Sequence, residues 1–200
     1  SSSIKELPRK ENLDGVKIIR SGYQYLGVQL AGIIYYLSNK KEYDIVVDQF
    51  HGIPFFTPLY VKKPILAVIQ EPAREVWFIN PLPWPLNWII GIIGFIGEPF
   101  VFLFYKKIAF MTGSESAKKD LVKLGIPEKN INIVPHGLIV EKLSKLPQKE
   151  KISTVSFLGV LSKDKGIEDA LKCFQALDKR GKFNFWIIGR SETNRYMNKI

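Results

Sequence analysis

The sequence contains little cysteine and little acidic charge, and it begins without an apolar leader. Cys173 is the only cysteine among 200 residues, which excludes an internal disulfide and indicates a reducing compartment. We expect Cys173 to be a small buried hydrophobic group on a helix. The polar start, Ser1-Ser2-Ser3-Ile4-Lys5, predicts no signal peptide. It lacks a methionine, as in a chain cut from a longer one.

Acidic side chains are the minority among the charged residues. The 29 basic and 19 acidic residues give a net charge of +10, which favours anionic partners such as nucleic acid, an anionic membrane or phosphorylated substrates. The lysines are spread along the chain, and no nucleic-acid-binding motif accompanies them. We therefore expect no nucleic-acid partner. No cluster of residues has the spacing of metal ligands, so we expect no metal site either.

Strand-like and helix-like segments alternate along the chain, which predicts an α/β fold. The continuous apolar run Tyr43–Asp48 is typical of a parallel strand that is buried on both faces. The predicted strands are Val16–Ile19, Tyr43–Asp48, Pro64–Ile69, Ile108–Met111, Ile131–Pro135, Ser153–Leu158 and Phe183–Ile188. The predicted helices are Tyr25–Leu37, a helix capped by Ser114 or Ser116 and stopped by Gly125 and Pro127, and Ile167–Lys179.

A charged stretch without periodicity, Glu141–Lys151, predicts an interdomain linker. It divides the chain into a first domain over residues 1–145 and a second over residues 152–200. The second domain holds one βαβ unit, which cannot bury both faces of its sheet. We therefore expect this domain to continue beyond Ile200, and the first domain to be incomplete at its start.

The turn between the last two predicted strands has the residues of a phosphate site. Gly159 ends a strand and lets a ligand approach the backbone closely. Gly166 opens a helix whose first N–H groups and dipole attract anions, and Lys163 and Lys165 add positive charge. This combination suits a diphosphate. The alternative is an ordinary strand–turn–helix corner with solvated lysines.

Three segments together resemble a known enzyme family. They are Thr112–Gly137, Phe157–Gly166 and Trp186–Gly189. In this order and spacing they are similar to the retaining GT-B glycosyltransferases of family 4, which include mannosyl- and glucosyltransferases acting on lipid acceptors. The resemblance extends over Tyr43 to Arg190.

The resemblance implies a GT-B fold of two Rossmann-like domains and a hexosyltransferase. Such an enzyme moves a hexose, with retention, from a nucleotide diphosphate sugar to a lipid or lipid-linked glycan at the cytoplasmic face of a membrane. It implies no cofactor beyond the donor and no obligatory metal. The residues implied to bind the donor diphosphate are Gly159, Lys163, Lys165 and Gly166.

Four further residues are candidates for contacts with donor or acceptor. His51 follows a predicted buried strand at its carboxyl end, where α/β proteins bind ligands. Gln70 occupies the place where the family often has a histidine, and His136 lies at the crossing between domains. Arg190 follows the last predicted strand. For His51, a loop histidine bonded to the backbone is an equally good interpretation.

Two departures from the family pattern keep a second function open. Val160 replaces the arginine that binds the leaving diphosphate, and valine cannot make that charge-assisted contact. Gln70 can donate and accept hydrogen bonds but cannot carry a proton. The alternative is a non-catalytic, membrane-attached binding or assembly subunit with a GT-B fold.

The most unusual stretch, Trp77–Phe110, is rich in tryptophan, phenylalanine and isoleucine. Its apolar part, Trp88–Phe104, is shorter than the roughly 20 residues of a spanning helix, and Glu98–Pro99 interrupts it, so we expect no transmembrane helix. Two interpretations remain, and both can hold: an acceptor-side helix pair with most apolar groups in the core, and a helix that contacts lipid at the membrane surface. The excess of apolar residues favours at least partial membrane contact. The membrane-contact candidates are Trp77, Trp84, Trp88, Phe95, Lys106 and Lys107.

Overall fold

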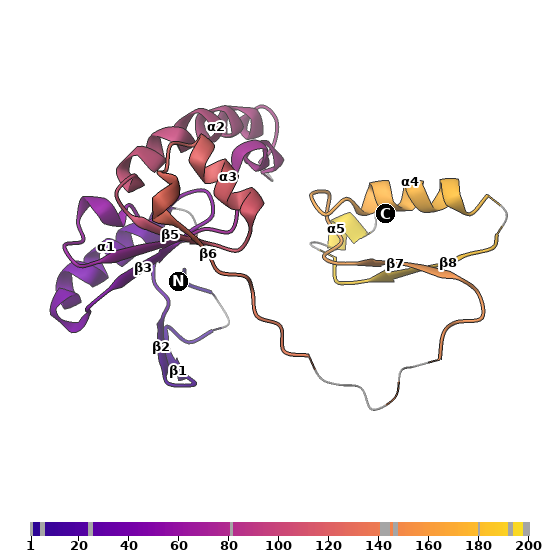
Figure 1. Cartoon of the computed structure of the whole chain (residues 1–200), viewed down its shortest axis with the longest axis horizontal. Coiled ribbons are helices and arrows are strands. Elements are labelled where there is room, and N and C mark those ends of the chain that lie inside the picture. Colours follow the sequence, from indigo (N-terminus) through magenta and orange to yellow (C-terminus); the bar gives the residue numbers. More distant parts are fainter. Residues whose placement is uncertain are drawn as a thin grey trace. The chain divides into compact units, whose positions relative to one another are not determined.

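The structure is a computed structural model that describes residues 2–4, 7–23, 26–80, 82–140, 145, 148–179, 181–191 and 194–197. The chain divides into two compact units, Ser1–Leu138 and Ile139–Ile200 (Figure 1). Much of the predicted linker, residues 141–144 and 146–147, lies outside the described residues. The predicted domain limits at 145 and 152 therefore stay a prediction.

Unit 1 contains a four-stranded parallel sheet. Its strands are β3 (Val46–Gln49), β4 (Ile65–Val68), β5 (Ala109–Thr112) and β6 (Ile131–Ile133), and they lie side by side in the order of the chain. Every neighbouring pair is parallel. This sheet confirms the predicted α/β class and makes unit 1 Rossmann-like; each strand lies within three residues of its predicted limits.

Helices and short 3-10 turns connect these strands. The α-helices are α1 (Leu26–Asn39), α2 (Leu86–Tyr105) and α3 (Glu115–Lys123). The 3-10 turns are η1 (Lys40–Glu42), η2 (Thr57–Leu59), η3 (Arg74–Ile79) and η4 (Glu128–Asn130). Of the two predicted caps, Ser114 is the one used, because its Oγ accepts a hydrogen bond from the N–H of Ala117 at 3.2 Å. Gly125 ends α3 in the left-handed region at φ +89°.

The core of unit 1 lies between one face of the sheet and the helices α2 and α3. Its buried side chains are Phe50, Ala67, Ile69, Phe102, Tyr105, Phe110, Leu121, Leu124, Ile126 and Ile131. The opposite face is open at Ile45 (54% exposed) and Val47 (55% exposed). The prediction that this strand is buried on both faces is therefore wrong. The reason is that β3 is an edge strand whose core-facing side alone meets the packed helices.

Helix α2 runs unbroken for 20 residues through Glu98 and Pro99. The pair interrupts the apolar run of the sequence but does not end the helix. The Glu98 carboxylate turns inward and accepts two backbone hydrogen bonds there. Helix α2 is long and apolar enough to cross a membrane. Only 22% of its most apolar 18-residue segment is buried inside the protein. The interpretation with most of its apolar groups in the core is therefore wrong.

A β-hairpin precedes the sheet of unit 1. Strands β1 (Lys10–Leu13) and β2 (Val16–Ile19) pair antiparallel. Asp14 and Gly15 form the connection with φ of +50° and +82°, the left-handed geometry of a tight two-residue hairpin turn. The predicted strand Val16–Ile19 is confirmed.

Unit 2 is the predicted βαβ unit. Strand β7 (Thr154–Leu158), helix α4 (Ile167–Leu177) and strand β8 (Asn184–Ile188) follow one another, and the two strands pair parallel. A short helix, α5 (Asn194–Met197), comes next. Phe174 of α4 stacks on Phe185 of β8, with ring centroids 4.6 Å apart. Cys173 is on α4 as expected but is exposed, because Phe174 occupies the inward position beside it.

Candidate functional site

The carboxyl edge of the four-stranded sheet gathers the polar candidates of unit 1. Because its strands are all parallel, the residues that follow them meet at one edge, which is where open α/β sheets bind ligands. His51 follows β3, Gln70 follows β4, Gly113 follows β5 and His136 follows β6. Three of these four residues are ones that the sequence singled out.

Gln70 and His136 meet over Gly113. A Cβ atom at position 113 would lie 2.7 Å from Oε1 of Gln70 and 3.2 Å from Nε2 of His136. Any side chain at this position would therefore displace one or both groups. Glycine leaves a small space that an amide oxygen and an imidazole face together.

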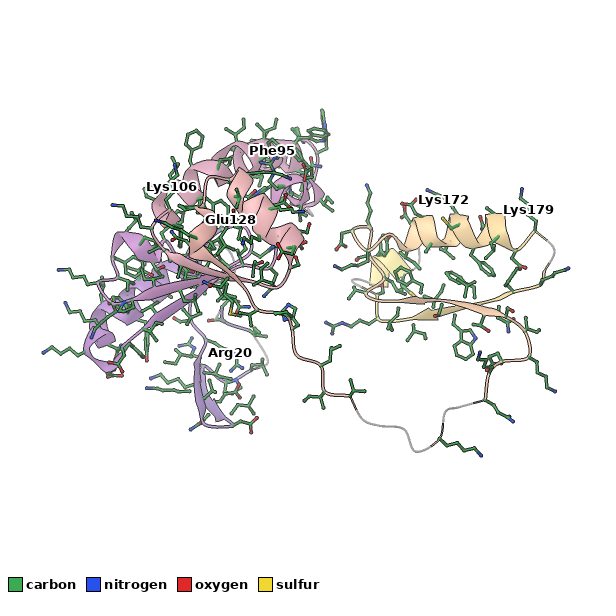
Figure 2. The ribbon with its side chains drawn as sticks, in the orientation of Figure 1. Arg20, Phe95, Lys106, Glu128, Lys172 and Lys179 are labelled. Atoms are coloured by element: carbon green, nitrogen blue, oxygen red, sulfur yellow. The ribbon has the colours of Figure 1, made fainter. Side chains whose placement is uncertain are left out.

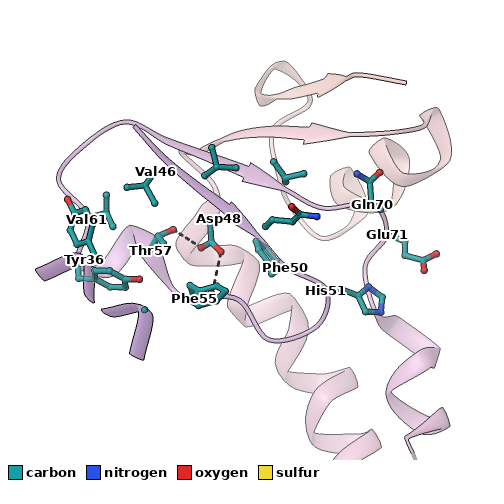
Figure 3. Close-up of a pocket in the computed structure, with 15 residues that line it drawn as sticks. Tyr36, Val46, Asp48, Phe50, His51, Phe55, Thr57, Val61, Gln70 and Glu71 are labelled. Atoms are coloured by element: carbon teal, nitrogen blue, oxygen red, sulfur yellow. Dashed lines mark hydrogen bonds between the residues drawn. The ribbon is translucent and has the colours of Figure 1, made fainter. Parts of the chain in front are cut away.

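A pocket of about 710 Å³ extends from this edge along β3 (Figure 3). His51, Gln70 and Glu71 lie at one end of it, and Tyr36 lies at the other (Figure 3). Further lining residues are Phe55, Thr57, Tyr60 and Val61. Its walls are largely aromatic and apolar with a few polar groups, as is common for pockets that bind small molecules.

The wall of this pocket is fixed by a buried carboxylate. Asp48 of β3 is 1% exposed, and its Oδ2 accepts a hydrogen bond from the hydroxyl of Thr57 at 2.6 Å (Figure 3). The same oxygen accepts from the hydroxyl of Tyr105, also at 2.6 Å. The N–H of Phe55 approaches Oδ1 at 3.4 Å. Burial, and then the negative charge of Asp48, raises the pKa of Tyr60 to about 12. Through its hydrogen bonds, Asp48 links strand β3 to the loop that follows it and to the last residue of α2.

Unit 2 carries the second group of candidates in one strand–turn–helix corner. Gly166 has φ +75° and caps α4, a conformation that favours glycine, and its N–H donates to the carbonyl of Lys163 at 3.1 Å. Gly159 and Gly189 lie side by side at the ends of β7 and β8. A Cβ at Gly189 would be 1.7 Å from the carbonyl oxygen of Gly159. Next to them, the Arg190 carbonyl accepts from the N–H of Leu161.

Charges at this corner are mixed. Lys163 and Lys165 are both exposed, and Nζ of Lys165 lies 3.7 Å from a carboxylate oxygen of Asp164. A hydrogen bond from Ser162 holds the pKa of Asp164 below its usual value. The first turn of α4 adds Glu168 and Asp169. Carboxylates near a helix N-terminus stabilise the helix but compete with an anionic ligand.

The membrane-contact candidates divide into exposed and half-buried side chains. Trp84 and Trp88 are 80% and 56% exposed. Trp77 is half-buried against α2, where a Cβ at Gly94 would lie 2.1 Å from its ring. Phe95 is also half-buried; its ring lies 5.8 Å from that of Phe78. Lys106 is exposed just beyond the end of α2 (Figure 2), and Lys107, the next residue, is exposed as well.

The sequence alone predicts no role for three residues of the site. They are Asp48, Glu98 and Gly113. Asp48 is the acidic end of an apolar strand, and Glu98 is the one charged residue of α2, so both were visible as polar exceptions in apolar runs. Gly113 carried no comparable signal, because its role depends on what surrounds it. Within the described residues, no three His, Cys, Asp or Glu side chains are grouped as metal ligands.

A parallel α/β sheet with polar groups at its carboxyl edge defines a Rossmann-like protein. No protein-family model matches the chain. Over 149 residues the chain is 26% identical to the alpha-galactosylglucosyldiacylglycerol synthase of Streptococcus pneumoniae (strain ATCC BAA-255 / R6). The alignment covers 66% of this chain and 38% of that protein. The chain is thus distantly similar to a glycosyltransferase and spans little more than a third of it.

Proposed function

We propose that this chain is part of a glycosyltransferase that moves a hexose from a nucleotide diphosphate sugar to a lipid or lipid-linked glycan, with retention, as a GT-B enzyme of two Rossmann-like domains. The observation that carries the proposal is the distant similarity to a diacylglycerol-glycan synthase in a chain whose sheet presents Gln70 and His136 at its carboxyl edge. The enzyme needs no cofactor besides its donor and has no nucleic-acid partner.

In this proposal the two units supply different contacts. Lys163, Lys165 and the backbone at Gly159 and Gly166 bind the donor diphosphate, and Arg190 lies beside them. His51, Gln70 and His136 contact donor or acceptor from unit 1. Catalysis of this kind depends on stabilising the leaving diphosphate by fixed charges and dipoles.

The outer face of α2 binds the membrane in this proposal. Its exposed apolar side chains recur at intervals of three and four residues and include Ile89, Ile92, Ile93, Ile96, Phe100, Leu103 and Phe104. A contiguous apolar face of this kind marks an interaction site. The inner face is bonded to the sheet domain through Tyr105 and Glu98, so α2 lies on the membrane and does not cross it. Lys106 and Lys107 then meet anionic headgroups. We propose that the protein is peripheral and, as the resemblance of its sequence implies, on the cytoplasmic face.

The second candidate is a membrane-attached binding or assembly subunit that keeps the fold without donor chemistry. Val160 in the place of an arginine and the acids Glu168 and Asp169 at the start of α4 favour it. Both candidates share the membrane face. They differ in whether a nucleoside diphosphate binds.

Calorimetric titration of the full-length protein with UDP and GDP separates the two candidates. For a transferase we expect binding, and Lys163→Ala combined with Lys165→Ala should weaken it at least about tenfold, the equivalent of one charge-assisted contact. Lys179→Ala, at the far end of α4, is the matched control (Figure 2). Absence of binding by the unaltered protein would refute the transferase and support the subunit.

Co-sedimentation with phosphatidylglycerol vesicles tests the membrane face. Replacing Trp84, Trp88 and Ile93 by serine should release most of the protein, because interfacial binding scales with the apolar area buried. Trp186→Ser, in unit 2, is the control and should leave sedimentation unchanged. Equal sedimentation of the triple variant and the unaltered protein would rule out this face.

A further inference from the structure

Helix α2 holds the loop that follows β4. Glu98 is 3% exposed; its Oε1 accepts from the N–H of Ala73 at 2.6 Å, and its Oε2 accepts from the N–H of Arg74 at 2.8 Å. Hydrogen bonds to a charged acceptor are about twice as strong as neutral ones. A buried carboxylate is costly unless such donors satisfy it, so an apolar side chain would suit this helix better if packing were its only role.

The backbone that Glu98 binds is in an unfavourable conformation. Arg74 has φ +41°, in the left-handed region that non-glycine residues rarely adopt. Strained residues of this kind persist where their surroundings fix them, and they concentrate at functional sites. The Arg74 guanidinium also lies 4.8 Å from the centroid of the Phe95 ring, which is a second contact with α2. Gln70 and Glu71, at the carboxyl edge, are two to four residues before this point.

The same helix reaches the loop that follows β3. The Trp77 ring packs against Gly94 of α2 on one side, and on another its Cη2 would lie 3.3 Å from a Cβ at Gly52. Gly52 is the neighbour of His51. Helix α2 therefore contacts, directly or through Trp77, both loops that bring polar side chains to the pocket.

We propose that Glu98 is a positioning residue of the carboxyl-edge site: through the N–H groups of Ala73 and Arg74 it fixes the loop that places Gln70 and Glu71. The inference rests on the proposed function in one respect, since it takes this edge as the ligand-binding edge. It adds a role for α2 besides membrane contact, because the helix with the apolar outer face also sets the geometry of the site.

Amide hydrogen exchange in the full chain tests the proposal. In Glu98→Gln one amide oxygen remains, while an NH₂ group faces the second N–H, so one donor loses its acceptor. We expect the amides of residues 73 and 74 to exchange at least about tenfold faster, as expected for the loss of one charge-assisted bond. Glu98→Asp keeps the charge and should restore most of the protection. Glu75→Gln, an exposed residue of η3, is the control and should change nothing.

Unaltered exchange at residues 73 and 74 in a folded Glu98→Gln protein would overturn the proposal. If Glu98→Gln does not fold, amide exchange is measured on the unaltered chain instead. The proposal requires the amides of residues 73 and 74 to be protected there, and exchange at the rate of an unstructured loop would refute the proposal. Titration with UDP and GDP then adds a readout that a purely structural role would not move. Measured at a temperature at which every variant is folded, Glu98→Gln should weaken binding at least about tenfold, and Glu98→Asp should recover part of it.

The two proposals fail separately. If the unaltered protein binds no nucleotide, the proposed function fails, and the exchange experiment still decides whether Glu98 fixes the loop. If the unaltered protein binds nucleotide and folded Glu98→Gln binds it equally well, the positioning role is wrong and the proposed function stands.

Discussion

Removing the hydroxyl of Tyr105 should destabilise unit 1 by about 1.5 to 3 kcal/mol, the range for hydrogen bonds to charged groups. That hydroxyl donates to Oδ2 of Asp48 at 2.6 Å inside the core, and the Tyr105 side chain is fully buried. Tyr105→Phe keeps the ring and its packing, so the cost reports the lost bond. Thr57→Val removes the second donor to the same oxygen while keeping the shape of the side chain.

The double variant should lose more than the sum of the two single losses. After either single change, one strong donor still satisfies the Asp48 carboxylate. After both, only the 3.4 Å approach of the Phe55 N–H remains, and a buried charge without donors is costly. We expect a coupling of at least about 0.5 kcal/mol, as is usual for groups in one network.

Urea unfolding followed by tryptophan fluorescence measures these losses. Trp186→Phe as the common background leaves the remaining tryptophans, Trp77, Trp84 and Trp88, in unit 1. With a urea dependence of about 1–3 kcal/mol per molar, a loss of ~2 kcal/mol lowers the midpoint by roughly 1 M. Tyr43→Phe is the control, because its hydroxyl donates to a neutral group, the hydroxyl of Tyr35, at 3.0 Å. A loss below about 0.5 kcal/mol for Tyr105→Phe, or strict additivity, would refute the reasoning.

Three further predictions concern local features. Gly113→Ala should displace the two side chains that meet over it and weaken nucleotide binding in a titration, while stability changes by less than about 1 kcal/mol. Ser114→Ala should cost about 1 kcal/mol in urea unfolding and Ser116→Ala much less, because only Ser114 caps α3. Ser162→Ala should raise the pKa of Asp164 toward its ordinary value in a carboxyl NMR titration. Since that pKa is lowered in the folded state, its stabilising contribution is present above the unfolded value of 3.8 and is lost as the pH falls through the lower folded value.

The α/β class and the positions of the strands could be predicted from the sequence, and so could the place of each polar candidate after its strand. Short apolar runs located β4, β5 and β6, and the parallel pairing of the strands in the structure brings His51, Gln70 and His136 to the same edge. Ser114 and Gly125 marked the ends of α3, because capping chemistry is local. The strand and cap predictions succeeded because each depends on residues close together in the chain, whereas the meeting of His51, Gln70 and His136 depends on the pairing of distant strands.

Burial could not be predicted with the same certainty, because it depends on what packs from elsewhere. Val47 belongs to a run typical of a fully buried strand, yet it lies on an open face. Cys173 sits on the predicted helix but points outward beside Phe174. The role of Glu98 required the loop after β4, which is 24 and 25 residues away in sequence, to fold back onto α2. The role of Gly113 could not be predicted either, because it depends on Gln70 and His136, which are distant in sequence and lie where a Cβ atom would be.

The strand–turn–helix corner of unit 2 shows how the surrounding structure changes the meaning of a motif. The motif predicts an anion site from a glycine, two lysines and a helix terminus, whose dipole amounts to about half a positive charge. Over residues 163–169 the two lysines stand against three acids, Asp164, Glu168 and Asp169, so the segment carries one net negative charge. Lys165 is already paired with Asp164. Arg190 and the helix dipole bring the corner close to neutral, so long-range attraction contributes little to diphosphate binding, and most of the binding comes from short contacts with the lysines and the backbone. Since salt screens exposed, distant charges far more than close contacts, diphosphate affinity at this corner should fall only slightly between low and physiological salt. A steep salt dependence would instead place the anion among the dispersed lysines of the basic surface.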